Sequence, residues 1–99
     1  MFEEVAQTLE AEGATARKMF GHRCLMVSGK GFAVDYHDDI VIKLDEPDHA
    51  RAMALEDSHL FEPMAGRPMK QWVQVSPEHA EDWLDLARAG MEYVDRLNS

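Results

Sequence analysis

The residues best suited to catalysis lie in an acid-free stretch near the N-terminus. Cys24, the only cysteine of the chain, stands two residues after His22. Because side chains at positions i and i+2 of a strand point to the same face, this histidine could act as the base that activates the thiol. A single cysteine followed by Leu25 and Met26 is more typical of a small side chain packed among apolar neighbours. We therefore favour a packed cysteine over a catalytic one.

Two further polar stretches could bind ligands but are better interpreted as turns. Residues 28–31, with the sequence SGKG, would have to open a helix to cradle a phosphate, yet the residues that follow have a strand pattern. His37-Asp38-Asp39 could attract a cation, but a polar turn explains it better. The five histidines show no HxH, HxxxH or HExxH spacing. We expect no catalytic residue, no metal and no cofactor.

Arg67 is the basic residue with the most distinctive surroundings. It lies between Gly66 and Pro68, in a turn that leads into the segment bearing Trp72. Its guanidinium could pair with the acidic loop around Glu62, or it could bind an anionic ligand. We favour the structural ion pair.

Charge is distributed unevenly along the chain. The 99 residues carry 10 Lys and Arg against 19 Asp and Glu, which gives a net charge of −9. This balance disfavours nucleic acid as a direct partner. Residues 13–34 and 64–76 nevertheless contain basic side chains and no acidic one. They could form a local basic face on an acidic body, although we favour solvated strand ends as the explanation.

Length and composition predict one domain over residues 1–99. No apolar run approaches the roughly 20 residues that a membrane-spanning helix needs. The N-terminus carries acidic residues where a secretory signal would be positively charged. A single cysteine cannot form an intramolecular disulfide, which suits a reducing compartment. We expect a cytoplasmic protein with no membrane partner.

Apolar periodicity predicts three helices. The first ends before Gly13 and has the inward stripe Phe2, Val5, Ala6 and Leu9. A short helix begins near Glu46 or Pro47 after the cap Asp45, with Ala50, Met53 and Ala54 facing inward. The last begins at Ser76-Pro77, runs to about residue 97 and has the inward stripe Ala80, Trp83, Leu84, Ala87, Met91 and Val94.

Alternating apolar residues predict strands at about 23–28, 32–36, 40–44, 60–64 and 69–75. Residues 16–22 read as a loop that leads into the first strand. A hairpin about His37-Asp38-Asp39 would pair Tyr36 with Ile40 and place Phe32, Val34, Tyr36, Ile40, Ile42 and Leu44 on the core face. The turn after residue 28 leaves open whether Leu25 and Val27 or Cys24 and Met26 point inward.

This order, α-β-β-β-α-β-β-α, predicts an α+β fold in which helices pack on one face of an antiparallel sheet. We expect the opposite face to carry Ala33, Val41, Lys43, Lys70 and Trp72, with Met26 joining them in one of the two registers. Apolar side chains beside lysines are typical of binding or self-association surfaces, unless a helix covers them. The candidate interaction surface therefore comprises Lys43, Arg67, Lys70 and Trp72.

An ordered set of short motifs resembles the N-terminal domain of the TfoX/Sxy family over about residues 14–95. The motifs are Lys18-Met19-Phe20-Gly21, Gly31-Phe32-Ala33, Ile42-Lys43-Leu44, Phe61-Glu62-Pro63-Met64, Gly66-Arg67-Pro68-Met69 and Trp72-Val73-Gln74-Val75. The resemblance implies a stand-alone bacterial α+β domain, similar to secretion-chaperone folds. The signature residues to which it assigns a structural role are Met19, Phe20, Gly21, Phe32, Gly66 and Met69. The YjbR family, sometimes described as DNA-binding, is similar in fold but usually lacks the Gly-Arg-Pro-Met run.

Full-length members of the TfoX/Sxy family add a C-terminal helical domain and regulate competence genes together with the cyclic-AMP receptor protein. The resemblance therefore implies a non-enzymatic regulatory domain that acts through protein contacts, with a second copy or a transcription component as partner. The alternatives are a ligand-binding or enzymatic site built from Cys24, Lys43 and Arg67, and a YjbR-like DNA-binding protein.

Overall fold

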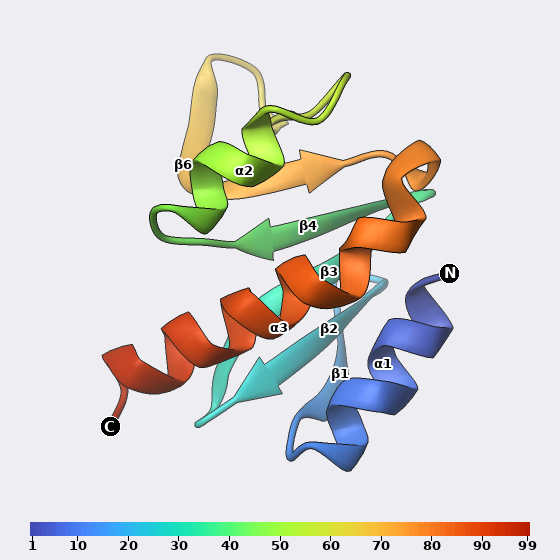
Figure 1. The fold of residues 1–99 in the computed structure, drawn as a ribbon, viewed down its shortest axis with the longest axis vertical. Coiled ribbons are helices and arrows are strands. Elements are labelled where there is room, and N and C mark those ends of the chain that lie inside the picture. Colours follow the sequence, from blue (N-terminus) through green and yellow to red (C-terminus); the bar gives the residue numbers. More distant parts are fainter.

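The computed structural model describes residues 1–99, which form three α-helices and one six-stranded sheet (Figure 1). In chain order the elements are α1 (Phe2–Ala11), β1 (Thr15–Met19), β2 (His22–Val27), β3 (Lys30–Tyr36), β4 (Asp39–Lys43), α2 (Asp48–Met53), β5 (His59–Met64), β6 (Arg67–Val75), a 3₁₀ turn η1 (Pro77–His79) and α3 (Ala80–Leu97). No helix combines the length and the apolar character that crossing a bilayer requires.

The strands lie in the order β1-β2-β3-β4-β6-β5, and every neighbouring pair is antiparallel. α1 and α3 lie across one face of this sheet, and α2 packs beside β4 and β6 (Figure 1). A core of 19 buried residues joins side chains of all three helices to the sheet. The α+β fold with helices on one face is therefore confirmed, and the opposite face carries no helix.

The helices agree with the sequence pattern where that pattern is long. α1 buries the four predicted residues Phe2, Val5, Ala6 and Leu9. α3 begins after the Pro77 turn and buries Trp83, Ala87 and Val94 of the predicted stripe, while Ala80, Leu84 and Met91 pack half-buried against the core. Its other buried residues, Leu86, Gly90 and Tyr93, were not predicted. The predicted inward face of α2 was wrong, because Ala50, Met53 and Ala54 are exposed and Ala52 is buried instead. A helix of this length has too few turns to define a stripe.

The predicted loop over residues 16–22 is wrong, because β1 and the start of β2 form a hairpin there. β1 pairs with β2 from Thr15 opposite Met26 to Met19 opposite His22. Phe20 and Gly21 form the two-residue turn with φ angles of +53° and +82°. Every residue of β1 is exposed, so the strand has no apolar alternation that a sequence pattern could reveal. The first run of strands therefore has four members rather than three.

The predicted register of the β3–β4 hairpin is also wrong. Tyr36 pairs with Asp39 rather than with Ile40, so the turn has two residues and not three. On its other side β3 contains a bulge, where Leu25 of β2 pairs with Ala33 and the next residue pairs with Gly31. Such a bulge interrupts the alternation of side chains between the two faces. Ala33, which we expected on the open face, therefore lies in the core.

The bulge changes which side chains of β3 face the helices. Phe32 stays in the core as predicted, while Val34 and Tyr36 turn to the open face. The core members of β4 are the predicted Ile40, Ile42 and Leu44. In β2, Leu25 is buried in the core and Val27 packs against it, which selects one of the two registers left open.

Gly90 allows α3 to lie directly against β4. A Cβ atom at this position would lie 2.7 Å from Cγ2 of Ile42 and 2.8 Å from the carbonyl oxygen of Lys43. Both neighbours are held by the sheet, so neither can move away without disturbing the strand. The close approach of helix and strand therefore depends on the absence of a side chain at Gly90.

Gly90→Ala should lower the free energy of unfolding by about 1–2 kcal/mol, because overpacking a well-packed core has a cost of that order. Helix propensity alone has the opposite sign, since Ala is better than Gly in a helix interior by about 1 kcal/mol. Urea denaturation followed by circular dichroism measures which effect dominates. An increase in stability would contradict the close packing described here.

Candidate functional site

The open face of the sheet is curved by a sharp bend in β6 (Figure 1). Leu60 of β5 pairs with Val73, whereas the next residue, Phe61, pairs with Met69, so residues 70–72 of β6 have no partner in β5. Extra residues on one strand of a pair bend that strand and increase its twist. The outer part of the β5–β6 hairpin, residues 61–69, is called the β5–β6 arm below.

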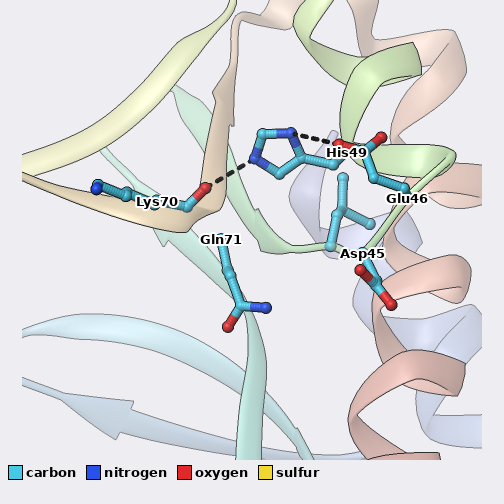
Figure 2. A pocket seen from close by; sticks show the side chains of 6 residues that line it. Asp45, Glu46, His49, Lys70 and Gln71 are labelled. Atoms are coloured by element: carbon cyan, nitrogen blue, oxygen red, sulfur yellow. Dashed lines mark hydrogen bonds and ion pairs between the residues drawn. The ribbon is translucent and has the colours of Figure 1, made fainter.

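The backbone of the bend has partners outside β5. Figure 2 shows the His49 ring between the carbonyl oxygen of Lys70 and the carboxylate of Glu46. His49 Nε2 donates to the Lys70 oxygen at 2.8 Å, and the Leu44 amide donates to the Gln71 oxygen at 2.9 Å. These groups line a small, open hollow of about 190 Å³ on the outer side of the bend. The residues that line this hollow therefore hold the bend in place.

The bend brings the β5–β6 arm over the open face. In the strand order, β4 and β6 lie between β3 and β5, so a flat sheet would separate β3 from β5 by about 14 Å. The rings of Tyr36 in β3 and Phe61 in β5 are nevertheless 4.9 Å apart. Tyr36 also contacts His22 and His37, with centroid distances of 4.9 Å and 4.4 Å. An aromatic cluster therefore ties the arm to the middle of the sheet.

Between the arm and the β1–β2 hairpin lies an apolar groove of about 880 Å³. Its 15 lining residues are Met19, Phe20, His22, Cys24, Met26, Gly29, Lys30, Gly31, Val34, Tyr36, Phe61, Pro63, Met64, Met69 and Trp72. Seven large apolar side chains of the chain are exposed, and four of them line this groove: Phe20 (95%), Met64 (64%), Met19 (45%) and Met69 (41%). This groove, which gathers more than half of the exposed large apolar side chains, is the candidate functional site.

The structure places the predicted interaction residues around the groove in different ways. Trp72 is half-buried and lines it. Lys43 lies directly across from Trp72 in the β4–β6 pair, and therefore on the same face. Arg67 is exposed at the start of β6, two residues before the groove residue Met69. Lys70 is exposed in the bend, where its backbone carbonyl accepts the bond from His49.

The expected ion pair between Arg67 and Glu62 is absent from the structure. Glu62 Oε2 instead accepts a hydrogen bond of 2.8 Å from the backbone amide of Gly66. A short carboxylate-to-amide bond closes the turn without the guanidinium. Arg67 is left exposed to solvent.

The signature residues divide between the groove, the turns and the core. Met19, Phe20 and Met69 line the groove, and Phe32 is buried in the core. Gly21 and Gly66 lie in hairpin turns with φ angles of +82° and +79°, which glycine adopts without steric cost. Met64 and Phe61 were not singled out from the sequence as site residues, because nothing in the local pattern shows that the arm folds over the sheet.

Cys24 lines the groove as a buried thiol with no hydrogen bond to His22, whose ring packs against Tyr36 and His37. Burial raises the pKa of its thiol, which keeps the thiol neutral near pH 7. Its Sγ lies 3.7 Å from the carbonyl oxygen of Leu25. Lys43 and Arg67 do not line the groove, so the three residues of the alternative ligand site do not converge on one pocket.

Comparison with known proteins identifies the family. The sequence model of the TfoX N-terminal domain matches residues 6–93, which is nearly the whole chain. The chain therefore belongs to the TfoX N-terminal domain family, a regulatory type of domain rather than a known enzyme family. No curated protein and no solved structure matches the chain.

His49→Ala should loosen the β5–β6 arm, because it removes the donor to the Lys70 carbonyl. A lost hydrogen bond of this kind lowers stability by about 1 kcal/mol. Hydrogen exchange followed by mass spectrometry should show faster exchange of amides in residues 59–75. His59→Ala is the matched control, since the only hydrogen bond of that ring is to the carbonyl of its neighbour Leu60. Equal exchange in both variants would contradict the supporting role of His49.

Cys24 should react with a disulfide reagent such as DTNB at least about tenfold more slowly in the folded protein than in urea, because burial disfavours the reactive thiolate. The raised pKa also fixes the sign of a pH effect. The thiol's contribution to stability is full below its unfolded-state pKa of about 8.5 and is lost as the pH rises towards its folded-state value. Cys24→Ala should remove this alkaline loss. A folded-state rate equal to that in urea would contradict the packed thiol.

Proposed function

We propose that this TfoX N-terminal domain is a non-enzymatic regulatory domain whose protein partner docks in the apolar groove. The observation that carries the proposal is the exposure of Met19, Phe20, Met64 and Met69 around one hollow on the face that no helix covers. Moving apolar surface from water into contact with a partner is favourable by about 25 cal/mol per Å². Contiguous exposed apolar surface of this kind is typical of interaction sites.

The chemistry of the groove supports binding rather than catalysis. Its lining contains no carboxylate, and its polar groups are few. The one thiol in the lining, that of Cys24, is buried and has a raised pKa. A nucleophile that acts in catalysis usually has a depressed pKa or a base that activates it. The groove instead resembles the apolar centre of a protein interface.

Phe20 supports a role in partner contact, because the local backbone conformation disfavours a bulky side chain at this position. It lies in a hairpin turn at φ +53°, a left-handed conformation that bulky side chains rarely adopt. Turns of this type favour Asn, Asp or Gly at both central positions. The side chain is also 95% exposed, so it gains nothing from the core. A large apolar side chain at such a position is best explained by a partner that covers it.

Regulation through a protein partner also suits the charge and composition of the chain. The net charge of −9 disfavours direct association with DNA. The single cysteine is unpaired and suits the reducing cytoplasm. We therefore place the domain in cytoplasmic transcription regulation, with a component of the transcription machinery or another regulator as the protein that it contacts.

The substitution Phe20→Asn tests the proposed function without destabilising the fold. Asn adopts the left-handed turn conformation more easily than Phe, so the free energy of unfolding should rise by about 1 kcal/mol. In cells that carry this variant in the chromosomal gene, transcript levels should change as they do in a deletion strain. Met53→Asn is the matched control, because Met53 is an exposed apolar residue outside the groove.

The control strain should keep the wild-type transcript profile. The proposal fails if the deletion alters no transcript. It also fails if Phe20→Asn cells match the wild type at equal protein level.

A further inference from the structure

We infer that the groove binds an amphipathic helix of a partner protein, with acidic residues flanking the apolar face of that helix. This inference rests on the proposed function and specifies the chemistry of the partner. Three observations carry it: the charges around the groove, the pairing of the strands that form its floor, and the kinds of side chain that line it.

Basic residues surround the groove although the protein as a whole is acidic. Lys30 lines the groove. Arg17 lies opposite the groove residue Cys24 in the β1–β2 pair, and Lys43 lies opposite Trp72 in the β4–β6 pair. Arg67 precedes Met69 by two residues on β6. The two acid-free segments of the sequence therefore meet at one site.

These basic residues are available to a partner. None of the four forms an ion pair within the chain. Two carboxylates close in sequence to the groove accept hydrogen bonds within the chain, Asp39 from Gln74 and Glu62 from Gly66. An apolar segment with flanking Asp and Glu would therefore meet attractive charges on several sides.

The pairing of the strands favours a helix over an added strand. The floor of the groove is formed mainly by β2 and β3, each of which is hydrogen-bonded to a strand on both sides. The backbone of these two strands is already paired, so a segment that lies on them must satisfy its own backbone groups. A helix does this internally and presents side chains alone, which is the helix-in-groove mode of recognition.

The lining side chains suit the apolar anchors of such a helix. Four are methionines, Met19, Met26, Met64 and Met69, whose flexible thioethers adapt to different anchor shapes. Phe61 and Trp72 add aromatic surface, which is enriched at binding hot spots. The volume of about 880 Å³ lies in the upper part of the range of about 300–1,000 Å³ that ligand pockets span.

A second copy of this chain does not provide a suitable helix. α1 and α3 bury their apolar faces in their own core, so neither has a free apolar face to offer. Contact between two grooves would bring Arg17, Lys43 and Arg67 of one copy towards the same basic residues of the other. Like charges placed together at an interface are unfavourable. The partner is therefore a different protein.

The test uses three labelled peptides of about 18 residues, or five helical turns. All have the same apolar face of Leu and Phe at i, i+3, i+4 and i+7. The first carries Glu on the remaining positions and the second carries Lys there. The third is the Glu peptide with a central Pro that breaks the helix. Fluorescence anisotropy with the full chain gives each dissociation constant, and amide shifts in two-dimensional NMR locate the site.

We expect the Glu peptide to bind at least tenfold more tightly than the other two, and more weakly as salt increases. Phe20→Asn and Met64→Asn should each weaken it at least fivefold, whereas the control Met53→Asn should not. The double variant Arg17→Glu/Arg67→Glu should reverse the preference in favour of the Lys peptide. Arg96→Glu, a charge reversal at the exposed C-terminal end of α3, should leave the preference unchanged.

The inference is overturned if the Lys or Pro peptide binds as tightly as the Glu peptide, or if no peptide binds at millimolar concentration. It is also overturned if vesicles containing phosphatidylserine, a labelled DNA duplex or a second copy of the chain occupies the groove more tightly. If the Lys peptide binds the wild-type protein and Phe20→Asn abolishes that binding, the acidic partner is refuted, whereas the groove is still supported as a protein-binding site. Failure of the proposed function is read separately, from unchanged transcripts in the deletion and Phe20→Asn strains.

Discussion

The bend in β6 is the constraint on which the open face of this domain depends. Residues 70–72 have no partner in β5, and the carbonyls of Lys70 and Gln71 are held by His49 and by the backbone of Leu44. Gln71 also donates through its side chain to the hydroxyl of Tyr93 in α3, at 2.6 Å. The bend is thus anchored to two helices, α2 and α3, and to the neighbouring strand β4. A strand that continued straight would leave the arm in the plane of the sheet, and the open face would be flat.

Two irregularities act together to make the groove. The bulge in β3 turns Val34 and Tyr36 away from the helices, and the bend in β6 brings Phe61 over them. Each lies where a sheet departs from regular pairing, and such departures often re-aim side chains near functional sites. Charged side chains are also distributed differently over the two faces of the sheet. The helical side carries exposed ion pairs such as Arg88 with Glu12, which lowers the pKa of that carboxyl, whereas the groove lining has no carboxylate.

The regular parts of the fold could be predicted from the sequence, because there the type of each residue indicates whether it is buried or exposed. The stripe of α1 and the inward residues of β4 follow directly from the spacing of apolar side chains. β1 could not be found in this way, since both of its faces are exposed and only the hairpin turn at Phe20-Gly21 marks it. The groove depends on the bulge and the bend, which arise from pairing between distant segments. Trp72 was identified because a tryptophan beside lysines is unusual on a solvated face, while Phe61 and Met64 have no comparable local signal.

The central claim is that the arm lies over the sheet in the free protein and that the groove exists before any partner binds. Nuclear Overhauser spectroscopy of the unbound wild-type chain tests this most directly, through the ring protons of Tyr36 and Phe61. The account predicts strong cross-peaks between these rings, together with those of the Val34–Val41 strand pair. The Val34–Val41 peaks without any Tyr36–Phe61 contact would show a folded sheet whose arm is not closed, and would contradict the account.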